Sequence, residues 1–293
     1  MKLELISEFK AHPRHAQAVL FTHDGRELAT TGMDALVQIW SLPEFANARS
    51  FQGHEKSANA IALSPDGATA VTGSTDRTVM VWDWKSGEPL HTLTGHRNTV
   101  AAVEFSPNGD LAATSAYGGM VGLWEGGSDT LDIFRSHPRH VTSLSFSSDG
   151  SSLATAGLGN VVKIWDVSAR ELVSEIEAPG HAATGCLFLP NGKLCCTTYE
   201  GEVVIYSADS YEPMASGFPQ AGRMSSATPL PDSDSLFCSV EGGVVVLDLD
   251  AMEILASYQT GIKGMYGVAC SSDGAIVAAV SADGRCRAWE VVR

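Results

Sequence analysis

Histidine, threonine and aspartate recur along the chain at spacings that suggest acid–base or nucleophilic chemistry. His12 is followed 18 residues later by Thr30 and 22 residues later by Asp34. The same set returns 42 residues further on as His54, Thr72 and Asp76. An imidazole, a hydroxyl and a carboxylate are the groups of a hydrolase triad. A catalytic centre occurs once in a chain, whereas this set repeats, so we interpret it as structural.

Other residue types associated with chemistry are present without the partners they need. His12-Pro-Arg-His15 and His137-Pro-Arg-His140 each offer two metal ligands, but no third ligand is identifiable. The six cysteines form no Cys-x-x-Cys pair and most lie among apolar residues, which favours reduced, buried thiols. No Gly-x-x-x-x-Gly-Lys-Ser/Thr phosphate loop occurs. The sequence therefore predicts no catalytic residue, no metal and no cofactor.

Composition and charge narrow the classes of partner. Of the 293 residues 44% are hydrophobic and 18% charged, as in ordinary globular proteins. The net charge of −15 opposes binding to nucleic-acid phosphates or to an anionic membrane, and it is compatible with a basic protein partner. No apolar run approaches the roughly 18 residues of a membrane span, and the first residues do not form a secretory signal. We expect a cytoplasmic protein.

A repeat of 41 or 42 residues organises the whole chain. One aromatic or apolar residue marks the end of a strand in each of seven units. These markers are Trp40, Trp82, Trp124, Trp165, Tyr206, Leu247 and Trp289. The seven units fill nearly all of the chain and leave no room for a second domain.

Each unit contains the same local signals. An Asp-Gly or Asn-Gly turn, such as Asp24-Gly25 or Asn108-Gly109, comes 12 residues after the histidine. Both residues of such turns tolerate positive φ, so they favour hairpins. Short apolar segments flank the turn, for example Val100–Phe105 and Leu111–Thr114, and a third leads to the marker residue. The pattern predicts many short antiparallel strands and almost no helix.

These motifs closely resemble those of the WD-repeat β-propeller family. The residues that bear the resemblance are Gly53-His54, Ser64-Pro65-Asp66-Gly67, Gly73-Ser74-Thr75-Asp76 and Trp82-Asp83, repeated in part as Gly95-His96 and Trp165-Asp166. The resemblance covers the whole chain. It implies a single all-β domain over residues 1–293, a seven-bladed propeller of four-stranded antiparallel blades around a central channel.

The two ends of the chain are expected to share one blade. The last unit stops after Trp289-Glu-Val-Val292 and supplies only three strands. WD-repeat proteins usually close by an N-terminal strand, so the resemblance implies that residues 2–10 complete the last blade. Closure removes exposed sheet edges. A closed ring needs no partner for its stability, and we expect a monomer.

In this family the repeated residues form a buried hydrogen-bond chain, in which tryptophan donates to threonine, threonine bonds histidine, and histidine donates to aspartate. Two units have all four members: His12, Thr30, Asp34 and Trp40, then His54, Thr72, Asp76 and Trp82. The third unit keeps His96, Thr114 and Trp124, but Gly118 occupies the aspartate position. The seventh has Gly261 where histidine would fall.

The resemblance also indicates where a partner would bind. In WD-repeat propellers partners often contact the top face, through residues three and five positions after the blade histidine and one position before the blade aspartate. The candidates at these or comparable positions are His15, Gln17, Met33, Asn59, Tyr117, His140, Leu158, Tyr199, Arg223 and Tyr266. Tyrosine and arginine are over-represented among interface hot spots.

The resulting functional hypothesis is a non-enzymatic scaffold or adaptor that binds peptides or domains on the top face. One alternative is a sensing or regulatory module working with a kinase or a signalling NTPase. The other is a propeller enzyme of the lactonase or dehydrogenase type, which needs carboxylates or histidines converging on the channel. Serine, threonine, tyrosine and asparagine predominate at the candidate positions, which disfavours the enzyme.

Overall fold

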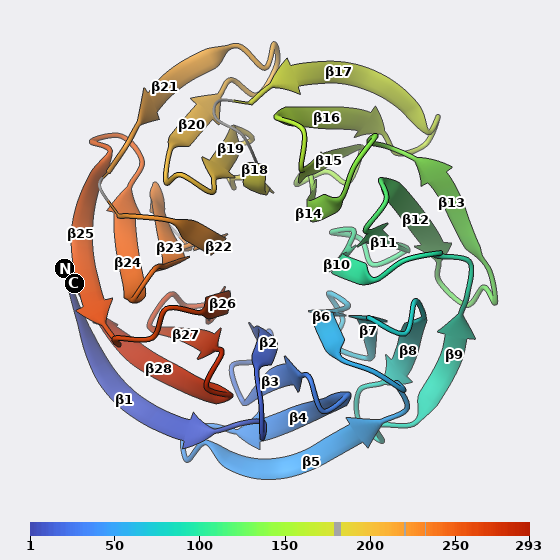
Figure 1. The fold of residues 1–293 in the computed structure, drawn as a ribbon, viewed down its shortest axis with the longest axis horizontal. Helices are drawn as coiled ribbons and strands as arrows, with labels where there is room; N and C mark the ends of the chain where they lie inside the picture. Colours follow the sequence, from blue (N-terminus) through green and yellow to red (C-terminus); the bar gives the residue numbers. More distant parts are fainter. Residues whose placement is uncertain (179–182, 220, 232) are drawn as a thin grey trace.

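The chain folds into a ring of seven four-stranded antiparallel sheets, and each sheet is one blade (Figure 1). The computed structural model describes residues 1–178, 183–219, 221–231 and 233–293, which contain 28 strands and no helix. The predicted all-β, seven-bladed propeller is confirmed. In every blade the first strand lies at the channel and the last at the outside of the ring (Figure 1).

Blades 1 to 4 follow one another in chain order. Blade 1 contains β2 (Ala16–Phe21), β3 (Glu27–Gly32), β4 (Leu36–Ser41) and β5 (Ala46–Gln52). Blade 2 contains β6 (Ala58–Leu63), β7 (Thr69–Ser74), β8 (Val79–Asp83) and β9 (Pro89–Leu93). Blade 3 contains β10 (Val100–Phe105), β11 (Leu111–Ala116), β12 (Met120–Glu125) and β13 (Leu131–Arg135). Blade 4 contains β14 (Val141–Phe146), β15 (Ser152–Gly157), β16 (Val161–Asp166) and β17 (Glu171–Glu177).

Blades 5 to 7 complete the ring. Blade 5 contains β18 (Ala183–Phe188), β19 (Leu194–Thr198), β20 (Val203–Tyr206) and β21 (Pro213–Gly217). Blade 6 contains β22 (Met224–Pro229), β23 (Ser235–Val240), β24 (Gly243–Asp248) and β25 (Glu253–Gln259). Blade 7 contains β26 (Met265–Cys270), β27 (Ile276–Ser281), β28 (Arg285–Val292) and β1 (Lys2–Lys10).

Apolar side chains on the two faces of each sheet hold neighbouring blades together. One buried cluster joins Ile39 and Phe51 of blade 1 to Ile61 and Trp82 of blade 2. Phe51 and Trp82 bring their rings to 5.6 Å and are almost fully buried. Burial of such rings supplies much of the stabilisation between sheets, because each removes a large apolar area from water.

The pairing of the strands defines two faces of the ring, a top face and a bottom face. In blade 1, Ala16 pairs with Gly32 and Leu36 with Gln52. The start of the first strand, the end of the second, the start of the third and the end of the fourth therefore lie at one end of the blade. We call this end the top face. It bears an entry loop before the first strand and a middle loop between the second and third strands, and the bottom face bears the remaining turns.

In blades 1, 2, 4 and 7 a serine or threonine and an aspartate side chain define the bottom-face turn between the first and second strands. In blade 2, Ser64 Oγ donates to Asp66 Oδ1 at 2.6 Å and accepts from the Thr69 amide at 2.9 Å. Gly67 follows with a φ of +71°, a conformation that glycine adopts without strain. The hydrogen bond from Ser64 and that from the Ala68 amide lower the pKa of Asp66. The Asp-Gly signal thus marks a turn whose carboxylate stays charged.

The N-terminal strand closes the ring as predicted. β1 pairs antiparallel with β28, from Lys2 opposite Val292 to Lys10 opposite Arg285, and completes the order β1-β28-β27-β26. Both chain ends lie together on the outside of blade 7 (Figure 1). The buried side chain of Leu3 joins the Trp289 cluster, and Phe9 packs 4.4 Å from the Trp40 ring of blade 1.

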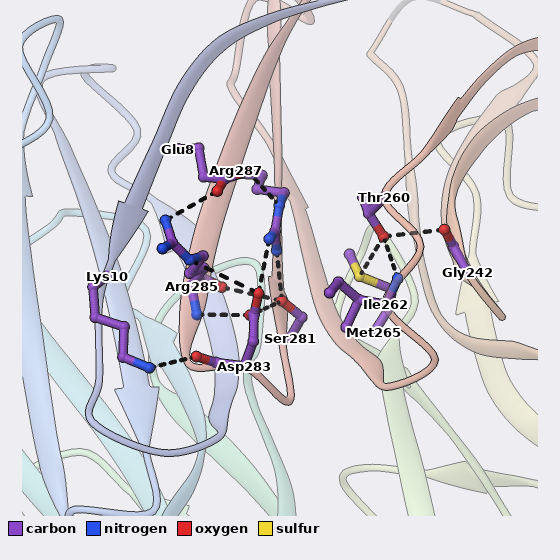
Figure 2. Close-up of polar contacts among 10 residues, drawn as sticks. All are labelled: Glu8, Lys10, Gly242, Thr260, Ile262, Met265, Ser281, Asp283, Arg285 and Arg287. Atoms are coloured by element: carbon purple, nitrogen blue, oxygen red, sulfur yellow. Dashed lines mark hydrogen bonds and ion pairs between the residues drawn. The ribbon is translucent and has the colours of Figure 1, made fainter.

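A buried arginine strengthens this closure. Arg287 Nε donates to Glu8 Oε2 at 2.8 Å, its Nη1 donates to Ser281 Oγ at 2.9 Å, and its Nη2 donates to Asp283 Oδ2 at 2.8 Å (Figure 2). Burial opposes ionisation of Asp283, but hydrogen bonds from Arg287, Ser281 and the Arg285 amide outweigh it and lower its pKa to about 2. The charge of Arg287 is therefore paired with those of Glu8 and Asp283 at the point where β1 meets β28.

Deletion of residues 1–10 should destabilise the whole ring, because it removes a complete strand together with the Leu3 and Phe9 contacts. We expect the melting temperature to fall by about 10 °C or more, since each kcal/mol corresponds to roughly 2–4 °C in a protein of this size. Differential scanning calorimetry measures the change. As a control, Leu5→Ser/Ile6→Ser alters two exposed side chains of β1 and should leave melting nearly unchanged. Unchanged melting of the truncated chain would contradict a stabilising role for closure.

Arg287→Ala should lower the free energy of unfolding by about 3 kcal/mol, because it removes the buried cation that pairs with the Glu8 and Asp283 carboxylates. Arg285→Ala is the matched control. Its side chain is 43% exposed against 7% for Arg287, and it contacts the same Glu8. We expect a cost of less than about 1 kcal/mol for this exposed pair. Urea denaturation of both variants tests the difference, and equal losses would refute a special role for Arg287.

Candidate functional site

A backbone hydrogen bond fixes the middle loop to the entry loop in six blades. In each case the residue before the aspartate position donates its amide to the carbonyl of the residue three positions after the histidine position. The pairs are Met33 to His15, Thr75 to Ser57, Tyr117 to Thr99, Leu158 to His140, Glu241 to Arg223 and Ala282 to Gly264, at 2.7–3.0 Å. Two of the three classes of candidate position therefore lie side by side on the top face.

A β-bulge places the third class of position at the channel. In every blade the pairing of the first and second strands shifts register near the top, which leaves the residue five positions after the histidine position unpaired. The skipped residues include Gln17, Asn59, Ala101, Thr142, Thr184, Ser225 and Tyr266. Bulges re-aim side chains at functional sites. Here all of the skipped residues except Thr184 line one cavity at the channel mouth.

This cavity has a volume of about 510 Å³ and a neutral lining. Four candidate residues contribute to it, namely Gln17, Asn59, Tyr117 and Tyr266. Hydroxyl groups of Thr75, Thr99, Thr142 and Ser225 lie among them, and none of the described lining residues is charged. Asn59 is held by hydrogen bonds from its Nδ2 to Thr75 Oγ1 at 3.1 Å and to the Val100 carbonyl at 3.0 Å. The cavity offers hydrogen bonds and aromatic surface.

Three tyrosines of the top face each pair with a basic or imidazole side chain of a neighbouring blade. The rings of Tyr117 and His140 stack with centroids 4.4 Å apart. Tyr266 lies 5.6 Å from the His15 ring, with its hydroxyl 3.4 Å from His15 Nδ1. Arg223 places Cζ 5.0 Å from the Tyr199 ring centre and donates to its hydroxyl at 3.3 Å. These pairs span blades 3–4, 7–1 and 5–6.

The remaining two candidates, Met33 and Leu158, are exposed at the rim. Their exposed fractions are 42% and 39%, close to the 39% of Tyr117. A close approach of strand and loop supports this rim in blade 4. A Cβ at Gly157, the last residue of β15, would lie 1.9 Å from the His140 carbonyl oxygen, so only glycine fits there. All ten candidate residues therefore lie on the top face, and four of them share the cavity.

Buried hydrogen-bond chains support the rim in blades 1 and 2. Trp82 Nε1 donates to Thr72 Oγ1 at 2.8 Å, Thr72 Oγ1 lies 2.7 Å from His54 Nε2, and His54 Nδ1 lies 3.0 Å from Asp76 Oδ2. In blade 1 the corresponding distances between Trp40, Thr30, His12 and Asp34 are 3.0, 3.0 and 2.9 Å. A histidine protonated on Nδ1 satisfies every member. This hydrogen-bond chain joins the middle strands of the blade to both of its top-face loops.

The electrostatics of this chain are those of a structural network. Burial lowers the pKa of His54 against the opposing effect of Asp76, so the imidazole is neutral at physiological pH. Burial also opposes ionisation of Asp76, but hydrogen bonds from the Thr78 hydroxyl and from the Thr78 and Glu55 amides outweigh it and hold its pKa at about 2. Thr72 has no exposed surface, so no substrate reaches the hydroxyl that would act as nucleophile.

Blade 3 departs from the chain expected from its sequence. His96 Nε2 lies 2.8 Å from Thr114 Oγ1, but Trp124 Nε1 donates to the Ser128 carbonyl at 2.7 Å instead of to Thr114. The bottom-face turn at Gly127, with a φ of +80°, presents this carbonyl to the indole. With glycine at position 118, His96 Nδ1 is buried and lacks a partner among the described residues, and burial lowers the pKa of His96 to about 4.

Sequence reasoning missed Arg287 as the polar centre of blade 7. A signal was present, because Arg287 is two residues before the buried Trp289 in β28 and alternate residues of a strand share a face. An arginine facing a sheet interior requires acidic partners, which Asp283 and Glu8 provide.

Histidine and cysteine side chains elsewhere in the described residues do not come together as a metal site or a reactive site. Both ring nitrogens of His12 bond within the blade network, and His15 faces Tyr266 instead. Within the described ranges no three His, Cys, Asp or Glu side chains lie where they could hold a metal ion. All six cysteines are free, and burial raises the pKa of each thiol, to about 12 for Cys186. The part of the chain described includes no helix able to span a membrane.

Comparison with known sequences gives one positive result. The family model described as "WD domain, G-beta repeat" matches residues 3–41, 46–83, 87–125, 128–166 and 254–290, about two thirds of the chain. The unmatched part between residues 167 and 253 contains blade 5 and the first three strands of blade 6. The marker residues of these two blades are tyrosine and leucine instead of tryptophan. No curated protein sequence matches the chain.

Asp76→Asn should lower the free energy of unfolding by about 1–3 kcal/mol, because the amide cannot accept all the hydrogen bonds made by the buried carboxylate. The pKa of Asp76 falls from an ordinary 3.8 to about 2 on folding, so its ionisation stabilises the fold above the ordinary value and this contribution is lost as the pH falls through about 2. The difference in free energy of unfolding between wild type and variant should therefore be largest above about pH 5 and become smaller toward pH 2.

Chemical denaturation across this pH range measures the difference. Asp209→Asn is the control, because the Asp209 side chain is exposed and its replacement should change stability little. An Asp76→Asn variant of unchanged stability that had lost a binding or catalytic activity would show that the network is functional instead of structural.

Proposed function

Because the chain belongs to the WD domain, G-beta repeat family, we propose that it is a non-enzymatic scaffold or adaptor that binds a protein partner on the top face of its propeller. WD40 propellers are usually non-catalytic, and the fold is commonly used as a protein-interaction scaffold. In this proposal residues 1–293 act as one domain whose seven blades form a rigid platform.

The observation that supports the top face most strongly is the convergence of its candidate residues on one cavity. Tyr117 and Tyr266 lie on different sides of the channel mouth and both line the cavity of about 510 Å³. Tyrosine supplies a large contact area at a low entropic cost and retains a hydroxyl for hydrogen bonding. Met33 and Leu158 add exposed apolar surface beside it. A central aromatic site surrounded by further contact surface is the arrangement expected of an interaction hot spot.

The chemistry of the cavity also favours binding over catalysis. General acid–base catalysis needs a titratable group within hydrogen-bond reach of a substrate. The lining formed by the described residues consists of apolar residues, amides, hydroxyls and two tyrosines, without a carboxylate or an imidazole. His12 and His54 instead bond Asp34 and Asp76 within blades 1 and 2, behind the rim.

Replacing both tyrosines in Tyr117→Ala/Tyr266→Ala should abolish capture of the partner from native cell extract without unfolding the protein. The reason is the loss of the two aromatic surfaces of the cavity, each expected to contribute about 2 kcal/mol or more. Affinity capture followed by mass spectrometry compares wild type, this variant and a control, Leu90→Ala/Val173→Ala, which removes exposed apolar side chains from the outer strands.

Capture of the same proteins by wild type and by the tyrosine variant would move the contact away from the top face. Absence of any captured protein would count against the scaffold function itself. Melting curves of all three proteins establish that they remain folded.

A further inference from the structure

Basic side chains are concentrated on the top face. Six blades each place one arginine or lysine in the entry loop: Arg14, Lys56, Arg97, Arg139, Arg223 and Lys263. The chain has only 19 basic residues against 34 acidic ones. Arg77 adds a further positive charge in the middle loop of blade 2. The top face therefore differs in charge from the molecule as a whole.

The positive charges of blades 1 to 4 are available to a ligand. Arg14, Lys56, Arg77, Arg97 and Arg139 are all exposed, and none of them forms an ion pair with another residue that the structure describes. An exposed, unpaired charge can pair with a charge of the partner without first breaking an ion pair within the protein.

Most acidic residues of the same loops are already engaged. The Asp34 and Asp76 carboxylates bond the histidines of their own blades and are partly or largely buried. In the top-face loops of blades 1 to 4, Glu55 is the remaining acidic residue. The half of the rim over these blades therefore presents a positive surface.

The bottom face has the opposite charge. Its turns bear aspartates that accept hydrogen bonds from a serine or threonine two residues earlier: Asp24, Asp66, Asp149 and Asp273. Those hydrogen bonds lower the pKa of each carboxyl, that of Asp149 to about 2, so the group stays ionised. The negative net charge of the chain is thus largely a property of the bottom and sides, and the propeller is polarised along its axis.

We infer that the top face over blades 1 to 4 binds an acidic protein segment, rich in aspartate or glutamate. Arg14, Arg97 and Arg139 receive its carboxylates, and guanidinium groups suit this pairing because they donate two parallel hydrogen bonds. The neutral cavity between them accepts a side chain through its hydroxyl and amide donors, such as Thr99, Ser225 and Gln17. This inference rests on the proposed scaffold function and specifies its partner.

The inferred partner differs from the one suggested by total charge. A net charge of −15 favours a basic partner, but only for a surface that shares the average charge. Glu200 and Glu241 in the middle loops of blades 5 and 6 also limit the positive surface to part of the rim. A nucleic acid would extend beyond this short arc and meet acidic surface, so a short acidic peptide fits better.

Fluorescence anisotropy with three labelled probes tests the inference. The probes are a peptide of ten glutamates, a peptide of ten lysines and a thymidine oligonucleotide of ten nucleotides. The glutamate peptide should bind more tightly than the other two, and its affinity should fall about tenfold between 50 mM and 200 mM salt because the contacts are charged and exposed. Tighter binding of the oligonucleotide or of the lysine peptide to the top face overturns the inference.

A matched pair of charge-reversal variants locates the contact. Arg14→Glu/Arg97→Glu/Arg139→Glu changes the top face, and Arg26→Glu/Lys85→Glu/Lys193→Glu makes the same change in net charge on the bottom face. The first should weaken glutamate-peptide binding by about tenfold or more, and the second by less than about twofold. Equal losses would mean that only total charge matters and would overturn the inference. The corresponding alanine triple variants replace any charge-reversal variant that does not melt like wild type.

The two proposals fail in different ways. Capture that depends on Tyr117 and Tyr266, combined with no binding of the glutamate peptide to wild type, leaves the scaffold function standing and overturns the acidic partner. Binding of the glutamate peptide that is lost only in the top-face charge variant supports both the face and the chemistry of the partner.

Discussion

The middle strands of every blade are buried on both faces, and this constraint determines where the molecule can interact with anything else. Strands such as β7 and β23 have almost no exposed residue, because a neighbouring blade packs against each side. A side chain on these strands is committed to the core. Interaction surfaces are left at the two ends of the blades and along the outer strands. The candidate residues accordingly lie in loops and at one bulge in each inner strand.

Burial of polar groups within this core links stability to the shape of the top face. In blades 1 and 2 a histidine from the entry loop bonds an aspartate of the middle loop, and in blade 7 Arg287 bonds Asp283 of the middle loop and Glu8 of the closing strand. The same bonds that satisfy buried groups therefore hold the two loops together. A rim held in this way is organised before a partner arrives, which reduces the entropic cost of binding.

The repeat predicts the blades well because each unit contains its own turn and marker residues. It also predicts the closure of the ring, because the last unit has only three strands and requires a fourth from elsewhere in the chain. The candidate positions lie near one another because strand register and a recurring bulge bring the same position of each repeat to the top face of its blade. Partners across blades were beyond this reasoning. The stacking of Tyr117 on His140 depends on how loops of adjacent units meet. The bond from Trp124 to Ser128 lies within blade 3 and depends on the conformation of the turn after β12. The separation of charge between the top and bottom faces could not be predicted for another reason. Loops of the two faces alternate along the chain, so the total charge averages over both faces.

The pairing of β1 with β28 also determines how the ring responds to mechanical force. Lys2 lies opposite Val292, so the two ends of this strand pair are neighbours at the same edge of blade 7. Tension applied between these residues acts across the hydrogen bonds one pair at a time, as in unzipping, instead of shearing all of them together. The ring would open first at the sheet that closes it, and blades 1 to 6 would retain their internal hydrogen bonds as this seam parts.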